Sequence, residues 1–216
     1  MADIGLIVLH TTKFGENSLV VHTLSREYGR RGFLVKGVGK RQMMSLFLPL
    51  NILEADIVEN NKSSLFTVRN ISARYPLSGI RSNMFKNSMT MFMSEVLYRV
   101  VREGGLEQGI YELCEKDILL LDAVRTDFSN FHIRFLLELA IALGFSPEAG
   151  DLMPFTGDHY PIVEKFMTSS FAEAMLIPLN GAVRNEIAEE ILRYIEFHSE
   201  CAVNVNSLRI LREIFA

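Results

Sequence analysis

The feature that most constrains the fold of this chain is a change of hydrophobic period near Pro76. Before Pro76, apolar residues occur in short runs bounded by glycine, asparagine, serine or charged clusters, which is typical of β-strands. After it, they recur at intervals of three and four, as on one face of an α-helix. A chain of 216 residues can bury two small cores. The sequence therefore predicts an α+β protein, with a β domain over residues 1–78 and a helical domain over residues 79–216.

Five apolar runs predict the strands of the first domain. The alternation is cleanest in the fourth run, where Leu53, Ala55 and Ile57 share one face, as a half-buried strand requires. A small sheet of five strands exposes its edges unless it closes, so we expect a five-stranded barrel of the oligonucleotide-binding (OB) fold. The runs are IGLIVLHTT, SLVVHTL, RGFLVKGV, ILEADIVE and SLFTVRNI.

The second domain is predicted to be a helical bundle. Between Phe145 and Gly181, four prolines and two further glycines interrupt the helical period, and proline removes a helical hydrogen bond. We therefore expect an irregular loop over residues 145–181. The predicted helices cover residues 81–103, residues from about Leu106 to Val124, a segment from a cap at Thr126 or Asp127 to Gly144, residues from about 183 to 199, and the closing SLRILREIF.

Several protein classes are disfavoured by simple patterns. The early run IGLIVLH has no preceding cation and is too short for a signal peptide, and no stretch approaches the ~20 apolar residues of a membrane span. We expect a soluble, cytoplasmic protein. Cys114 and Cys201 lie 87 positions apart without any CxxC motif, so neither a zinc module nor a disulfide framework is expected.

Motifs of enzymes are also missing. A phosphate-binding loop ending at Lys40 would need glycine at Leu34 and serine or threonine at Arg41, and a dinucleotide fingerprint starting at Gly37 would need glycine at Gln42. No GxSxG elbow occurs, and no two histidines are spaced as i and i+4. Only His159, beside Asp158, is a candidate metal ligand or acid-base residue, and the pattern that supports it is weak. The sequence predicts a protein that is not an enzyme and needs no cofactor.

The strongest local feature is a basic stretch in an acidic protein. The formal net charge is −4, yet residues 1–80 hold ten Lys or Arg against six Asp or Glu, and residues 81–216 hold twelve against twenty. Between residues 26 and 41 the only acid is Glu27, which leaves a local charge of +5. The six cations of this basic stretch are Arg26, Arg30, Arg31, Lys36, Lys40 and Arg41.

Two interpretations of the basic stretch are open. A run of cations usually forms a solvated strand face. Here the run spans a strand and loop of the predicted barrel and is interleaved with Tyr28, Phe33 and glycines, which favours binding of single-stranded nucleic acid through phosphates and stacked bases. Phe33 itself fits a core position at least as well as a stacking position.

An ordered series of segments resembles the RecO family of bacterial DNA repair and recombination mediators. The series consists of LIVLHTTKFGENSLVVHTLSREYGRRGFLVKGVGK (6–40), LFLPLN (46–51), IRFLLELAIALGFSP (133–147) and SLRILREIF (207–215). It covers nearly the whole chain and both predicted domains in order. Many family members carry a four-cysteine zinc module after the third helix, but residues 145–181 contain no cysteine, so zinc is not expected.

The resemblance implies a protein without catalytic activity that binds single- and double-stranded DNA and anneals complementary strands. It also implies that, with its partner RecR, the protein helps to load RecA onto DNA coated by single-strand-binding protein. The basic stretch would hold the strands by counterion release, without reading sequence. The acidic bundle would repel DNA and confine it to the barrel.

The resemblance further implies a site for the acidic, Phe-ending tail of single-strand-binding protein on the helical domain. The matching basic position is Arg134, which Leu137 and Ile141 would flank with an apolar groove. The alternative is that Arg134 pairs with Glu138 on an exposed face of its helix.

Two other functions stay open. The barrel could dock an acidic protein partner without binding nucleic acid, or the loop with His159 could support a metal-dependent hydrolase or nucleotidyl transferase. The first predicts no mobility shift of labelled DNA at low salt, and the second predicts turnover that His159→Ala abolishes.

Overall fold

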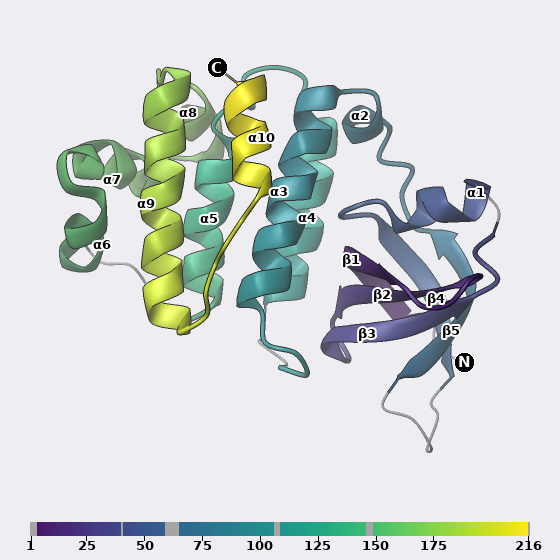
Figure 1. Cartoon of the computed structure of the whole chain (residues 1–216). Coiled ribbons are helices and arrows are strands. Elements are labelled where there is room, and N and C mark those ends of the chain that lie inside the picture. Colours follow the sequence, from purple (N-terminus) through teal and green to yellow (C-terminus); the bar gives the residue numbers. More distant parts are fainter. Residues whose placement is uncertain (1–3, 40, 59–64, 106–108, 146–148, 216) are drawn as a thin grey trace.

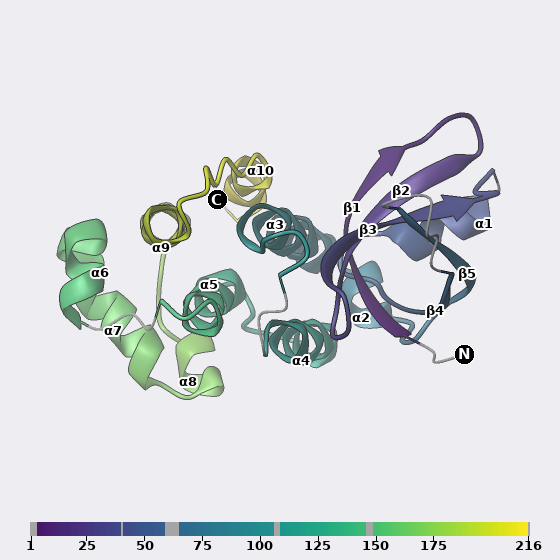
Figure 2. The same ribbon diagram turned by 90° about the horizontal axis from the view of Figure 1, so that it is seen from below.

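The barrel and the bundle lie side by side in the computed structural model, which describes residues 4–39, 41–58, 65–105, 109–145 and 149–215 (Figure 1). The helices α3 and α4 stand next to the barrel, and α6 and α7 lie at the opposite end of the bundle in both views (Figure 2). Of the helices formed by the described residues, none combines the length and the apolar composition that a bilayer crossing needs.

The predicted barrel is confirmed. The five strands close in the order β1-β2-β3-β5-β4, which is the topology of the OB fold. All neighbouring pairs are antiparallel except β3 and β5, which pair in parallel through only two residue pairs. The strands are β1 (Ile4–Lys13), β2 (Ser18–Ser25), β3 (Gly29–Lys36), β4 (Ile52–Val58) and β5 (Phe66–Ala73).

The first part of strand β1, as far as Leu9, is buried on both of its faces. Leu6 and Val8 belong to the core inside the barrel, whereas Ile7 and Leu9 belong to the core of the bundle. Because successive side chains of a strand point to opposite faces, a strand between two cores must be apolar at consecutive positions. This explains the continuous run IGLIVL. Leu24, Leu50 and Ile52 join Ile7 and Leu9 in this barrel–bundle junction.

The helical domain follows the sheet after a short connection. The sheet ends at Ala73, and the first helix after it begins at Ser78. The helices that the described residues form are α1 (Arg41–Met44), η1 (Ser45–Phe47, 3-10), α2 (Ser78–Arg81), α3 (Met84–Val100), α4 (Ile110–Ala123), α5 (Phe131–Ala142), α6 (Ala149–Thr156), η2 (Gly157–His159, 3-10), α7 (Tyr160–Thr168), α8 (Phe171–Met175), α9 (Gly181–Ser199) and α10 (Ser207–Ile214).

The prediction of an irregular loop over residues 145–181 is wrong, because α6, α7 and α8 form in this segment. The prolines lie where helices tolerate them. Pro161 occupies the first turn of α7, where its missing N–H has no helical partner. Pro154 lies near the end of the short α6 and removes a single bond. Leu152, Val163 and Phe166 anchor these helices in the bundle core.

The third predicted helix begins later than expected. Its cap is Asn130 rather than Thr126 or Asp127, because Asp127 adopts a left-handed backbone with φ 55° that no helix accommodates. The Asn130 amide instead donates to Ala174 O, and its oxygen accepts from the Arg184 guanidinium. The predicted apolar stripe of α5 is confirmed by the burial of Phe131, Phe135 and Leu139.

A part-buried guanidinium fixes the barrel to the bundle. Arg81, at the end of α2, donates to Pro49 O and to Asn51 Oδ1 on the barrel side and to Asn87 Oδ1 in α3. Asn51 in turn donates to Ser45 O and Leu46 O, so one network holds the segment between β3 and β4 against the bundle. Burial lowers the pKa of Arg81, although the charge of Asp122 opposes this.

Removing this guanidinium should destabilise the whole protein. In Arg81→Ala, the part-buried acceptors Pro49 O and Asn51 Oδ1 lose their donor, and we expect a loss of about 2–3 kcal/mol in the free energy of unfolding. Urea denaturation followed by circular dichroism measures this loss. Arg193→Ala is the matched control at an exposed site, where a change within about 0.5 kcal/mol is expected. Equal effects of the two substitutions would contradict the role of the network.

Candidate nucleic-acid interface

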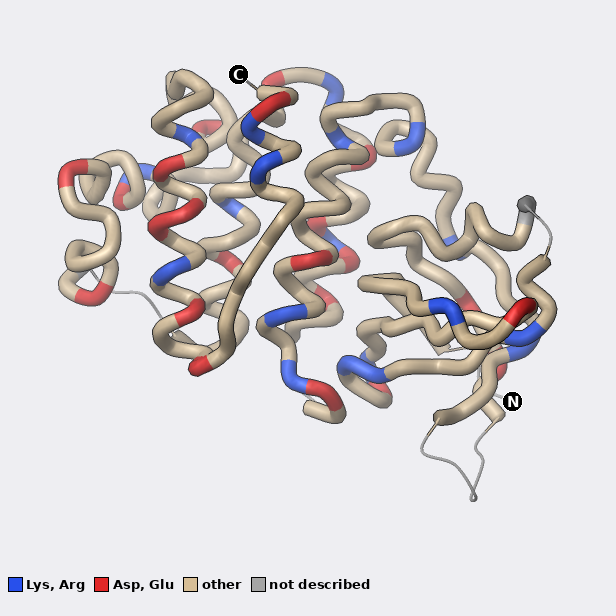
Figure 3. The backbone as a smooth tube through the Cα atoms, in the orientation of Figure 1, with Lys and Arg blue, Asp and Glu red and all other residues tan. Residues whose placement is uncertain are grey.

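Those cations of the basic stretch whose side chains the structure describes do not share one face of the barrel. Lys and Arg positions lie both at the end of the barrel that meets the bundle and at its far side (Figure 3). Arg26 belongs to the turn between β2 and β3, and Arg30, Arg31 and Lys36 belong to β3. Lys40 lies outside the described residues. Arg41 begins α1, but its side chain is also outside the described part of the chain.

Arg26 contacts the bundle. Its Nε donates to Glu112 Oε1 of α4 at 2.6 Å, and its guanidinium lies 5.2 Å from the centre of the Tyr111 ring. Burial raises the pKa of Tyr111 to about 12, with a smaller contribution from the charge of Glu115. The side chains of Arg26 and Glu112 are each half exposed, so their pairing contributes only about 0.2–1 kcal/mol.

Arg30 also faces the bundle and is more deeply placed. Its guanidinium lies 5.0 Å from the centre of the Tyr98 ring of α3, and its Nη2 lies 3.9 Å from Glu103 Oε2. Its carbonyl accepts from Gly104 N at 2.9 Å. The side chain is only 15% exposed. Arg26 and Arg30 are therefore two cations of the barrel–bundle junction.

Two histidines complete the same junction. The rings of His10 in β1 and His22 in β2 lie 4.9 Å and 5.1 Å from the Tyr98 ring. Burial lowers the pKa of His22, and the nearby His10 lowers it further. Both histidines are therefore structural residues of their strands at this junction.

Arg31 stacks on an aromatic group at the barrel. Its guanidinium lies 3.8 Å from the centre of the Phe66 ring, at the start of β5, and 6.0 Å from the Tyr28 ring. Tyr28 in turn meets Phe33 and Phe66 edge-on at 6.0 Å and 5.9 Å. Phe33 is fully buried in the barrel, so the core position that the sequence left open is the one it occupies.

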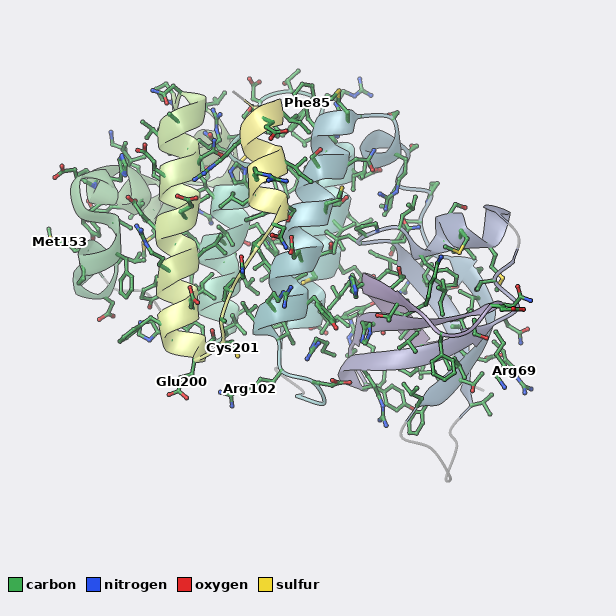
Figure 4. All side chains as sticks on the ribbon, viewed as in Figure 1. Arg69, Phe85, Arg102, Met153, Glu200 and Cys201 are labelled. Carbon is green, nitrogen blue, oxygen red and sulfur yellow. The ribbon has the colours of Figure 1, made fainter. Side chains whose placement is uncertain are left out.

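The open cationic surface lies where β3 and β5 separate. A groove of about 610 Å³ runs there, and the exposed Lys36 and Arg69 lie on it. Figure 4 places Arg69 on the side of the barrel away from the bundle. We call this the distal groove; its lining consists of Val35, Lys36, Met43, Val58, Thr67, Val68, Arg69, Asn70 and Ile71.

Arg69 is the residue that sequence reasoning missed. It is the only cation of the run SLFTVRNI, so no cluster marked it. Its neighbour Asn70 has a left-handed backbone with φ 51° and donates to Asp56 Oδ2 at 2.7 Å, at an irregularity in the β4–β5 pairing. Only the closure of β3 on β5 brings Arg69 to the same groove as Lys36.

The predicted tail site on α5 has a different local structure from that expected. Arg134 donates to Glu138 Oε1 at 2.7 Å, as the alternative interpretation predicted, and also to Phe166 O and Ser169 O at the end of α7. Leu137 is 2% exposed and Ile141 is 53% exposed. The structure therefore does not gather the three side chains around an open groove.

His159, the remaining candidate, is held by carboxylates of α9. Its Nδ1 lies 3.0 Å from Glu190 Oε1 and its Nε2 lies 3.6 Å from Glu186 Oε2. Within the described ranges, no group of three or more histidine, cysteine or acidic side chains is arranged to hold a metal ion.

The network around Arg134 contains a buried carboxylate with a perturbed pKa. Burial raises the pKa of Asp117 to about 6, and the nearby Glu138 adds to the effect, whereas Lys116 at 3.2 Å opposes it. Lys116 also donates to Glu138 Oε2 at 2.6 Å. The charged form of Asp117 is therefore disfavoured in the folded protein.

This carboxylate makes stability depend on pH with a definite sign. The folded pKa of about 6 exceeds the ordinary value of 3.8, so the folded state binds more protons in that interval and the contribution of Asp117 to stability falls as pH rises through it. Asp117→Asn should raise the free energy of unfolding by about 1–2 kcal/mol at pH 7 and have little effect at pH 4. Denaturation at several pH values tests this, and a destabilised variant at pH 7 would contradict it.

Comparisons with known proteins cover both parts of the chain. Residues 4–77 match the family described as Recombination protein O N terminal. The DNA repair protein RecO of Bacteroides fragilis is 30% identical, over 76% of this chain and 68% of the relative. The RecO protein of Flavobacterium johnsoniae is 31% identical over 76% and 71%, and that of Christiangramia forsetii is 29% identical over 97% of both chains.

Proposed function

This chain belongs to the RecO family of DNA repair proteins, and from that premise we propose that its barrel binds single- and double-stranded DNA and anneals complementary strands. We include in the proposal that, with RecR, the protein helps to load RecA onto DNA coated by single-strand-binding protein. In this role the protein acts by binding and positioning, without catalysing a reaction.

The observation that carries the proposal is the distal groove. Lys36 and Arg69 lie on it as exposed cations of an OB-fold barrel, and the adjoining β3 and β5 carry Arg31 stacked on Phe66. Exposed cations along a groove are what the backbone of a single strand needs, since its phosphates pair with the charges. Lys40 and Arg41, which follow β3 in the sequence, are included in the proposed surface on the strength of the sequence alone.

The cations of the barrel–bundle junction have a secondary place in this proposal. Arg26 already pairs with Glu112, and Arg30 lies between Tyr98 and Glu103. A phosphate at either position would have to compete with a carboxylate of the acidic bundle. We therefore assign DNA contact chiefly to the distal groove.

DNA binding should depend on salt and on the two cations of the distal groove. Affinity for a labelled oligonucleotide should fall steeply with salt, because phosphate contacts release counterions. Lys36→Ala combined with Arg69→Ala should weaken binding by roughly tenfold at low salt, evenly across sequences, and should reduce the salt slope by about two. Fluorescence anisotropy at several salt concentrations measures both quantities. Arg26→Ala is the matched control and should bind almost as the parent does.

Two results would contradict this account. If no DNA binds at low salt while a protein partner is retained, the barrel serves as an adaptor for an acidic partner. If binding is insensitive to salt or selective for sequence, phosphate contacts do not dominate. An annealing assay with complementary strands coated by single-strand-binding protein then shows whether a chain that binds DNA also acts as a mediator.

Recognition of the tail of single-strand-binding protein remains part of the proposal, with Arg134, Leu137 and Ile141 as its site. The carboxylate of the tail would have to displace Glu138 from the Arg134 guanidinium, because Arg134 Nε donates to Glu138 Oε1 at 2.7 Å. Arg134 also binds carbonyls at the end of α7, so replacing it would disturb the fold. Ile141 is the better position for a test because its side chain is exposed.

Ile141→Glu should abolish measurable binding of a synthetic acidic peptide that ends in phenylalanine, because the new carboxylate repels the peptide. Isothermal titration calorimetry provides the measurement. Leu176→Glu, at another exposed apolar position, is the matched control and should leave binding unchanged. Unchanged binding by Ile141→Glu would place the tail elsewhere on the protein.

A further inference from the structure

Strand β1 extends beyond β4, its neighbour on one edge. Residues 4–7 pair with β4, and Val8 exchanges backbone bonds with Leu50 and Asn51. From His10 to Lys13, β1 pairs with β2 only. Among the described residues, no backbone hydrogen bond reaches the other edge of this segment. An unpaired edge presents donors and acceptors to any extended chain that fits beside it.

The register identifies the groups on this open edge. Phe14 N donates to Ser18 O at 2.9 Å, and bonded and non-bonded pairs alternate along antiparallel strands. Thr12, opposite Val20, therefore exchanges its bonds with β2. The N–H and C=O of Thr11 and Lys13 point away from β2. These two residues present the open backbone groups.

The open edge borders a cleft between the barrel and α3. The cleft has a volume of about 300 Å³, and Thr11 of β1, Phe47 of η1 and Tyr98 of α3 are among its lining residues. The views in Figures 1 and 2 agree in placing β1 beside α3. The lining is largely apolar, with Phe47, Pro49 and Met91 among its residues, and the Met91 side chain is 43% exposed. An apolar wall next to an open backbone edge is the arrangement that strand addition requires.

The charges of the cleft favour a peptide over a polynucleotide. Glu95 lies in the wall, where its carboxylate accepts from Asn206 N and from Ser207 N and Oγ. Burial opposes its ionisation, but the hydrogen bonds from Ser207 prevail and lower the pKa of Glu95, so the carboxylate is charged. This anion repels phosphates, while the nearby Arg99 balances its charge. The cleft therefore has no dominant sign of charge.

From this geometry we propose that the cleft binds an extended peptide segment of a partner protein, added as a strand to β1. The backbone of the segment pairs with Thr11 and Lys13. The segment carries no net charge, and one of its bulky apolar side chains packs against Met91. This site is separate from the distal groove and from α5, so it adds a protein-docking surface to the proposed DNA function.

The test uses the full chain and peptides selected from a phage-displayed library of random decapeptides. An enriched peptide is synthesised with a fluorescent label, and its affinity is measured by anisotropy. Thr11→Pro removes the N–H that points outward without removing a bond to β2, and we expect at least a tenfold loss of affinity. Thr11→Ala keeps the N–H and should bind as the parent does.

A second pair of variants tests the inference independently of whether Thr11→Pro folds. Met91→Glu places a charge in the wall of the cleft and should also reduce affinity at least tenfold. Met153→Glu, at an exposed methionine of α6 at the far end of the bundle (Figure 4), should have no effect. The DNA affinity of each variant is measured in parallel. It should stay unchanged, which separates this inference from the proposed DNA function.

Three results would overturn the inference. The library yields no peptide that binds the parent chain; the enriched peptides bind Thr11→Pro and Met91→Glu as tightly as the parent; or an oligonucleotide displaces them with a steep salt dependence. The last result would assign the cleft to nucleic acid.

Discussion

The burial of β1 between two cores is the constraint on which the rest of the structure depends. Leu6 and Val8 fill the barrel, and Ile7 and Leu9 belong to the core that the bundle builds. Each fully buried side chain of this kind contributes about 1.5–3 kcal/mol. The barrel is therefore packed against the bundle through its own first strand, and the Arg81 network fixes the same junction from the side of α2. This junction determines which barrel surfaces remain open to a ligand.

The distribution of charge follows from this junction. The bundle part of the chain is acidic, so cations of the barrel that face it meet carboxylates such as Glu112 and Glu103. Cations on the opposite side, including Lys36 and Arg69, stay exposed. One stretch of sequence thus supplies two functions: Arg26 and Arg30 help to join the two parts of the molecule, and Lys36 contributes to the surface that we assign to DNA.

The sequence predicted those features that depend on local pattern. The five strands, the alternation in β4 and the stripe of α5 follow from hydrophobic period, which a single chain displays directly. The helices α6 and α7 were missed because the count of prolines suggested a loop, although the effect of each proline depends on its position within a helix.

The candidate site was only partly predictable, because its geometry depends on contacts between distant residues. Arg26 meets Glu112 across 86 positions, and no local pattern reveals this pairing. Arg69 reaches the groove of Lys36 only through the parallel contact of β3 and β5. Leu137 is apolar and lies one turn from Arg134, yet the packing of α5 buries it. Sequence pattern identifies strands and helices, whereas long-range closure decides which side chains share a surface.

The most direct test of the central claim is a hydrogen-exchange footprint of the full chain with and without a single-stranded oligonucleotide. The account predicts added protection over residues 31–36 and 66–71, which border the distal groove, and no change over residues 98–105 and 109–112 at the junction. Protection confined to the junction, with the strands around Lys36 and Arg69 unchanged, would contradict it.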